Sequence, residues 1–150
     1  MQKDSNINLE FFRQLCKKHN LRITPQRIFI YKAASSSQEH PNTEHVYKTV
    51  KYELPNTSFD TVHRTLLIFY NINLLNVFER FGNPKRFDPN LKNHHHLHCE
   101  KCGKIIDFTC EEYDKSHVPK KLTSNFKIKK RELLSVVYVK NVRKVNNLLR

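Results

Sequence analysis

Hydrophobic residues recur at helical spacing through the first half of the chain. Residues 9–19 carry them at positions 11, 12, 15 and 16, which predicts a first helix. A second helix is predicted to begin at Thr24 and Pro25, because threonine is a favourable N-cap and proline suits the first helical position.

Two further helices follow from the same pattern. The third is predicted to begin at Asn42 or Thr43 and to end before Pro55, which cannot continue a helix. Four residues are expected to form its buried stripe: Val46, Tyr47, Val50 and Leu54. The fourth is predicted within residues 57–72, from a Ser or Thr cap through Phe59, Val62, Leu66, Phe69 and Tyr70.

The pattern then changes to short β-type runs. Residues 73–89 read NLLNVFERFGNPKRFDP, and the turn residues Gly82-Asn83-Pro84 at their centre predict a hairpin. Three or four helices followed by a basic hairpin are typical of a winged helix. In that fold the fourth helix would enter the major groove of DNA while the hairpin touches phosphates.

The second half of the chain has a mixed pattern. Residues 88–93, DPNLKN, are interpreted as a hinge. Beyond them we expect a strand at KIIDFT, a helix over about 111–121, a strand at FKIKKRELLSVVYV and a last short helix. The predicted fold class is therefore α+β, with a winged-helix domain at 1–87, a hinge at 88–93 and a second domain at 94–150.

Charge and cysteine content indicate the class of binding partner and the cellular compartment. The net charge of +13 indicates a polyanionic partner, either nucleic acid or an anionic membrane surface. No segment approaches the roughly 18 apolar residues of a membrane span, and the N-terminus lacks the apolar run of a signal peptide. We therefore expect a soluble cytoplasmic protein, in which Cys16, Cys99, Cys102 and Cys110 are thiols or metal ligands rather than disulfides.

Residues 94–103, HHHLHCEKCG, combine four histidines with two cysteines. His94, His96 and His98 alternate, so on a strand their imidazoles would share one face. Asp88 precedes this cluster and Asp107 follows it, and imidazole together with carboxylate suits Fe(II) or Mn(II). For any single histidine, the alternative is a solvated surface residue.

Cys99 and Cys102 form a Cys-x-x-Cys pair, with Gly103 permitting a left-handed backbone conformation. A closed structural zinc site needs four ligands, and no second cysteine pair follows. The pair could recruit His98, His117 or Cys110, or could be two thiols on a tight turn. Zinc binding at Cys99 and Cys102 is therefore left open.

The order of these features resembles the ferric uptake regulator family of bacterial metal-dependent repressors. The segments that carry the resemblance are LRITPQR at 21–27, HPNTEHVYKTV at 40–50, SFDTVHRTLLIF at 58–69, RFD at 86–88, HHHLHCEKCGKIIDF at 94–108 and NFKIKKRELLSV at 125–136. The resemblance implies a homodimer with an N-terminal winged helix and a C-terminal α/β dimerisation domain. It also implies a regulatory metal between the two domains that sets their relative angle.

The resemblance further implies a set of metal ligands. Those of the family's peroxide-sensing branch fall on five residues: His40, Asp88, His94, His96 and Asp107. Asp88 favours this branch, because the iron-sensing branch usually has Glu at that position. With Fe(II) bound, peroxide would oxidise a ligand histidine, His40 or His94, whereas a Mn(II) form would be insensitive.

Three departures from the family pattern change what we expect of the zinc site, of an additional metal site and of the operator sequence. The second Cys-x-x-Cys would fall at Val139 and Val142, so the common four-cysteine zinc site cannot form. A histidine of an additional metal site is replaced by Lys130 or Arg131, and that site is not predicted. The usual Tyr of the fourth helix is His63, which leaves the operator sequence open.

Ten residues are predicted to contact DNA. They lie at the start of the fourth helix, near the start of the second helix and on the hairpin: Ser58, Asp60, Thr61, His63 and Arg64; Arg22, Gln26 and Arg27; and Lys85 and Arg86. The alternative for each basic residue is a solvated charge.

Together these features predict a metal-dependent repressor that binds double-stranded operator DNA and senses peroxide through oxidation of ligand histidines. The main alternative is a sensor of iron or another metal in the same family, without a peroxide response. A thiol switch at Cys99 and Cys102 is a further alternative. A metalloenzyme is disfavoured, because the His-x-Glu and Pro-Cys-x-x-Cys pattern of zinc deaminases is not met; no catalytic residue and no small organic substrate are expected.

Overall fold

The computed structural model describes residues 8–37, 40–79, 83–100, 102–115 and 134–137. The chain divides into two compact units, residues 1–91 and 92–150, each with its own elements. The domain boundaries expected from the sequence, 1–87 and 94–150 with a hinge at 88–93, remain a prediction. Several predicted features lie outside the described residues: Gly82 of the hairpin turn, His117, Lys130, Arg131, Val139, Val142 and the last short helix.

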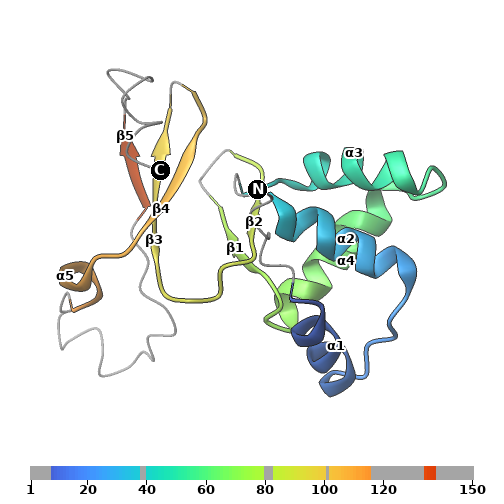
Figure 1. Ribbon diagram of the computed structural model, residues 1–150. Helices are drawn as coiled ribbons and strands as arrows, with labels where there is room; N and C mark the ends of the chain where they lie inside the picture. Colours follow the sequence, from blue (N-terminus) through green and yellow to red (C-terminus); the bar gives the residue numbers. More distant parts are fainter. Residues whose placement is uncertain (1–7, 38–39, 80–82, 101, 116–133, 138–150) are drawn as a thin grey trace, which may run out of the picture. The chain divides into compact units, whose positions relative to one another are not determined.

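The first unit contains the four helices that the hydrophobic pattern predicts: α1 (Leu9–Lys18), α2 (Pro25–Ser36), α3 (Thr43–Glu53) and α4 (Phe59–Asn71) (Figure 1). Each begins at a side-chain cap. Thr24, Asn42 and Ser58 accept hydrogen bonds from the backbone N–H groups of Arg27, His45 and Thr61. These bonds satisfy donors that an uncapped helix start leaves without a helical partner, so local sequence fixes where each helix begins.

An aromatic cluster joins α1, α2 and α4 at the centre of this unit. The ring centroids of Phe12 and Tyr31 are 5.0 Å apart, and Phe69 meets their edges at 5.8 and 6.2 Å. Val46 and Val50 of α3 are buried in the same core, as predicted. Tyr47 and Leu54, which belong to the same predicted stripe, are only partly buried; Tyr47 packs at the surface against Phe59, 5.5 Å away.

The predicted hairpin is also present. Strands β1 (Asn76–Phe78) and β2 (Arg86–Asp88) pair antiparallel, with Val77 opposite Phe87. Phe87 is fully buried in the helical core, and its backbone N–H donates to the Pro41 carbonyl at 3.0 Å. This anchor places the end of β2 beside the segment that leads into α3.

The second unit is built on a three-stranded sheet with the order β4-β3-β5. The central strand β3 (His95–Cys99) pairs antiparallel with β4 (Ile105–Phe108) and parallel with β5 (Leu134–Val137), and α5 (Glu111–Asp114) follows β4 (Figure 1). The predicted strand at KIIDFT is confirmed. Of the helix predicted over 111–121, α5 is the described part, and residues 116–121 lie outside the description.

Candidate metal centre and nucleic-acid interface

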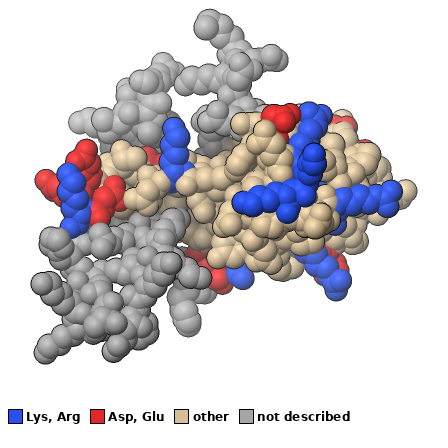
Figure 2. All heavy atoms as spheres, turned by 90° about the horizontal axis from the view of Figure 1, so that it is seen from below, with Lys and Arg blue, Asp and Glu red and all other residues tan. Residues whose placement is uncertain are grey.

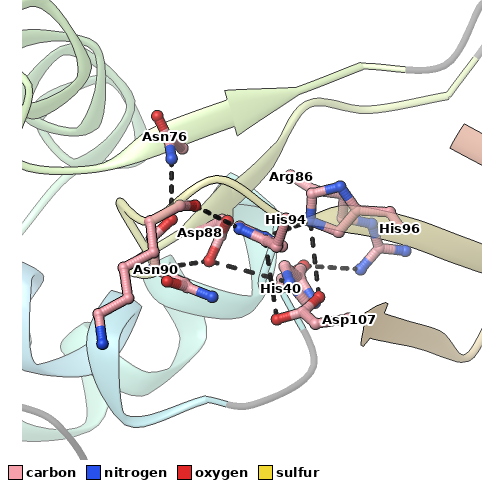
Figure 3. Close-up of polar contacts among 9 residues, drawn as sticks. His40, Asn76, Arg86, Asp88, Asn90, His94, His96 and Asp107 are labelled. Atoms are coloured by element: carbon pink, nitrogen blue, oxygen red, sulfur yellow. Dashed lines mark hydrogen bonds and ion pairs between the residues drawn. The ribbon is translucent and has the colours of Figure 1, made fainter. Parts of the chain in front are cut away.

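Two histidines and one aspartate of the second unit converge at β3. His94 lies just before the strand, and the strand register places His96 directly opposite Asp107 on β4. The Nε2 atoms of His94 and His96 are 3.0 Å apart, and the Asp107 carboxylate lies 3.5 Å from His96 Nε2 and 3.9 Å from His94 Nε2 (Figure 3). One ligand atom from each of the three lies within 4.8 Å of the others.

The hydrogen bonding of His94 prepares it for a cation. Its Nδ1 lies 2.7 Å from the Lys92 carbonyl oxygen, which can only accept, so Nδ1 carries the hydrogen. Nε2 therefore presents its lone pair to His96 and Asp107. A histidine whose other nitrogen donates to a carbonyl is the usual form of a metal ligand.

The spacing of these groups fits one ion. Ligand atoms bonded to one ion at about 2.1 Å and at right angles lie roughly 3.0 Å apart, which is the separation of the two Nε2 atoms. Both imidazoles are buried, with 2% and 0% of their surface exposed, while the Asp107 side chain is 35% exposed. Imidazole and carboxylate together suit Fe(II), Mn(II) or Zn(II).

A second pair of candidate ligands lies in the first unit. His40 Nε2 is 3.8 Å from Asp88 Oδ1, and both residues are buried (Figure 3). Arg86 donates to the His40 carbonyl at 3.3 Å, and the Asn90 N–H donates to Asp88 Oδ1 at 2.8 Å. His40 has a φ of 51°, which is uncommon outside glycine, so packing of the hairpin holds it in this conformation.

The five predicted ligands thus form a triad in one unit and a pair in the other. His98 is outside the triad although it alternates with His94 and His96. Sequence reasoning missed His95 and Asp114, which interact on the opposite side of β3. Successive side chains of a strand point to opposite faces, so the sequence already indicated that His95 lies on the side away from His94 and His96.

The cysteines are not part of this group. Cys99 is buried and Cys102 is exposed, and Gly103 has the expected positive φ, 69°, in the turn that follows. Within the described ranges, no cluster of three or more candidate ligands includes a cysteine. Burial in the first unit's core raises the pKa of the Cys16 thiol, and the Arg27 charge opposes this shift.

The start of α4 presents the predicted DNA-reading residues. Ser58 Oγ and Thr61 Oγ1 are 2.8 Å apart, and Arg64 pairs with Asp60 at 2.9 Å on the exposed surface. His63 Nδ1 lies 3.3 Å from Thr43 Oγ1, and its ring is parallel to that of Phe59. The first turn of α3 thereby contacts the His63 imidazole.

Other predicted DNA contacts have partners inside the protein. Gln26 donates to Thr57 at 3.0 Å, and the Arg27 guanidinium donates to the Arg22 carbonyl. Lys85 lies 3.9 Å from Glu79. In Figure 2, Lys and Arg side chains extend from the helical unit, at the right of the view, among fewer acidic ones. In the part of the chain that the structure describes, no helix is long and apolar enough to cross a membrane.

Comparisons with known proteins place these features in a family. A model described as the ferric uptake regulator family matches residues 18–136. The peroxide-responsive repressor PerR of Staphylococcus epidermidis is 38% identical over 98 residues, which cover 65% of this chain and 65% of that protein. PerR of Staphylococcus aureus strain Mu50 is 37% identical over 92 residues, 61% of this chain and 62% of that protein. Both matches span less than two thirds of the relative's length.

Solved structures of ferric uptake regulator family proteins are also similar to this chain. The ferric uptake regulator Fur of Helicobacter pylori, reported with three functional metal binding sites, matches with a TM-score of 0.74 and 25% identity over 93% of this chain and 95% of that chain. The Campylobacter jejuni peroxide stress regulator matches with a TM-score of 0.65 and 27% identity over 87% of this chain and 97% of that chain. These matches confirm the predicted fold class, α+β with an N-terminal winged helix-turn-helix and a C-terminal α/β domain.

Proposed function

Because the chain belongs to the ferric uptake regulator family, we propose that it is a metal-dependent transcriptional repressor. The observation that carries the proposal is the triad of His94, His96 and Asp107, in which two buried imidazoles and a carboxylate converge on one point. The two Nε2 atoms are 3.0 Å apart and the carboxylate lies within 3.9 Å of both, so one ion could take a ligand atom from each residue.

In this proposal His40 and Asp88 complete the site, so that one Fe(II) or Mn(II) has ligands from both units of the chain. The ion would then favour one orientation of the winged helix relative to the second domain. A homodimer in that state would present its two α4 helices about one turn of DNA apart, as two-fold readers of operators require. Metal binding and DNA binding would be coupled by roughly 1–3 kcal/mol.

For DNA recognition we propose that Ser58, Asp60, Thr61, His63 and Arg64 face the major groove. Arg22, Gln26, Arg27, Lys85 and Arg86 would contact the phosphate backbone. In the protein alone Arg64 pairs with the exposed carboxylate of Asp60, and an exposed pair of this kind contributes little to stability. The guanidinium can therefore exchange Asp60 for DNA at small cost.

Metal-dependent DNA binding is the first test of this proposal. We expect Mn(II) to strengthen binding to DNA selected from a random library by the Mn(II)-loaded protein, by about 5–150-fold. Log affinity should fall by about 0.9 per contacted phosphate for each log unit of salt. Fluorescence anisotropy with and without chelator measures both quantities. Equal affinity in the two conditions would refute a metal-dependent repressor.

We further propose that the protein senses peroxide. Fe(II), when bound, supplies the redox chemistry by which peroxide transfers one oxygen atom to an imidazole carbon and leaves as water. His40 and His94 are the proposed targets, because the resemblance to the peroxide-sensing branch of the family points to these two ligands. An oxidised imidazole is a poorer ligand, so oxidation would release both metal and DNA. The peroxide-sensing relatives support this choice over a sensor of metal level alone.

Peptide mass spectrometry tests the sensing step. After a brief peroxide pulse on anaerobically Fe(II)-loaded protein, we expect one added oxygen on peptides that carry His40 or His94. Mn(II)-loaded protein, treated identically, should remain unmodified. Unmodified histidines in both samples would favour the metal-level sensor. Oxidation confined to Cys99 and Cys102 would favour the thiol switch.

A further inference from the structure

The carboxylate of Asp114 contacts the residues on both sides of His94. The Asn93 side-chain amide donates to Asp114 Oδ1, and the same oxygen lies 3.5 Å from His95 Nε2. Asp114 is the last residue of α5, so one carboxylate ties this short helix to the start of β3. His94 lies between the two tied residues.

His95 is held firmly on the side of β3 opposite the metal triad. It is 1% exposed, and its ring lies 5.3 Å from that of Phe108, its neighbour across the strand pair, and 5.7 Å from that of Tyr113. Its Nε2 is also 3.4 Å from the Cys110 carbonyl oxygen, which can only accept. Nε2 therefore carries a hydrogen directed toward Cys110 and Asp114.

These contacts bear on the metal triad through the backbone. Successive side chains of a strand point to opposite faces, so fixing His95 and Asn93 on one face fixes the direction in which His94 points on the other. The bond from His94 Nδ1 to the Lys92 carbonyl depends on the same short stretch. Metal sites require their ligands to be held within about 0.5 Å of the productive geometry.

We propose that Asp114 is a positioning residue for the metal centre. Through Asn93 and His95 it holds the backbone on both sides of His94, so that His94 Nε2 stays directed at His96 and Asp107. The inference rests on the proposed function, since it assumes that this triad binds a metal ion. It adds a residue that the ligand set does not contain and that never touches the ion.

Cobalt binding by the full-length protein tests this inference. Co(II) is the probe because its visible absorption reports the geometry of its ligands. We expect Asp114→Ala to weaken Co(II) binding by about 10–100-fold, the usual effect of removing a group that orients a ligand, and to shift the absorption bands. Asp114→Asn retains an oxygen that accepts from Asn93 and His95, so it should keep most of the affinity and the wild-type spectrum.

Glu111→Gln is the matched control. Glu111 is on the same helix, is highly exposed and pairs with Lys115, so its substitution should leave affinity and spectrum unchanged. Asn93→Ala removes the exposed hydrogen bond from Asn93 to Asp114 and leaves the contact of Asp114 with the buried His95 in place. It should shift the Co(II) absorption bands in the same direction as Asp114→Ala. This second variant tests the inference should Asp114→Ala fail to fold, as judged by circular dichroism without metal.

Wild-type affinity and spectrum in either folded variant, Asp114→Ala or Asn93→Ala, would overturn the positioning role alone, provided that His96→Ala loses Co(II) binding. If wild type and His96→Ala bind Co(II) equally, the triad is not the metal site. The proposed function and this inference would then fail together.

Discussion

Replacing His96 with alanine should weaken Mn(II) binding by more than about 100-fold, beyond the roughly 10–100-fold effect of losing a group that only orients a ligand. His96 is fully buried, and its Nε2 meets both His94 Nε2 and the Asp107 carboxylate. Alanine removes this nitrogen and supplies no replacement ligand atom. Titration of Mn(II) into the protein, followed by electron paramagnetic resonance of the free ion, measures the loss.

The same substitution should remove the effect of Mn(II) on DNA affinity, because the metal could no longer favour one state of the protein. His98→Ala is the matched control. His98 is on the same strand and is also a histidine, but it is outside the triad. His98→Ala should bind Mn(II) like wild type. A His96→Ala protein that still shows metal-dependent DNA binding would contradict the assignment of the site.

The helices of the first unit could be predicted because their signals are local. A cap and the residues that it bonds are three positions apart, as at Thr24 and Arg27 or at Ser58 and Thr61. The hairpin likewise follows from short strands around a turn. The signals for these features lie within short segments, so they can be recognised in the sequence without knowledge of the tertiary contacts.

The polar partners of the predicted DNA-contacting residues could not be predicted in this way. Gln26 bonds to Thr57, 31 positions away, and Arg86 bonds to the carbonyl of His40, 46 positions away. Only packing of α2, of the segment before α4 and of the hairpin brings these groups together. The positive φ of His40 has the same origin, since nothing in the neighbouring sequence demands it.

The metal triad was predictable for a different reason. His94 and His96 are two residues apart, so strand alternation alone places them on one side, and Asp107 follows in the next strand of an antiparallel pair. The same rule places His95 on the other side. Its partner Asp114 lies on a four-residue helix, whose packing against β3 depends on a tertiary contact between its own Tyr113 and His95. A pattern of alternating histidines therefore predicts the proposed ligands but not the contact of Asp114 with His95.

Phe69→Ala should lower the free energy of unfolding by about 3–5 kcal/mol, the usual cost of deleting a buried aromatic ring. Phe69 is fully buried on α4 and meets the edges of both Phe12 and Tyr31, so its loss leaves a cavity lined by two rings that cannot close it. Urea denaturation of the metal-free protein, followed by the circular dichroism of its helices, measures the change.

Tyr70→Ala is the control for this prediction. Tyr70 is the next residue on the same helix and is 46% exposed, so its substitution should cost no more than about 0.5 kcal/mol. Because α4 is also the proposed recognition helix, Phe69→Ala should weaken DNA binding at temperatures where the first unit begins to unfold, whereas Tyr70→Ala should not. Equal destabilisation by the two variants would show that Phe69 does not anchor α4 to the aromatic cluster. The position of the DNA-reading residues would then require another explanation.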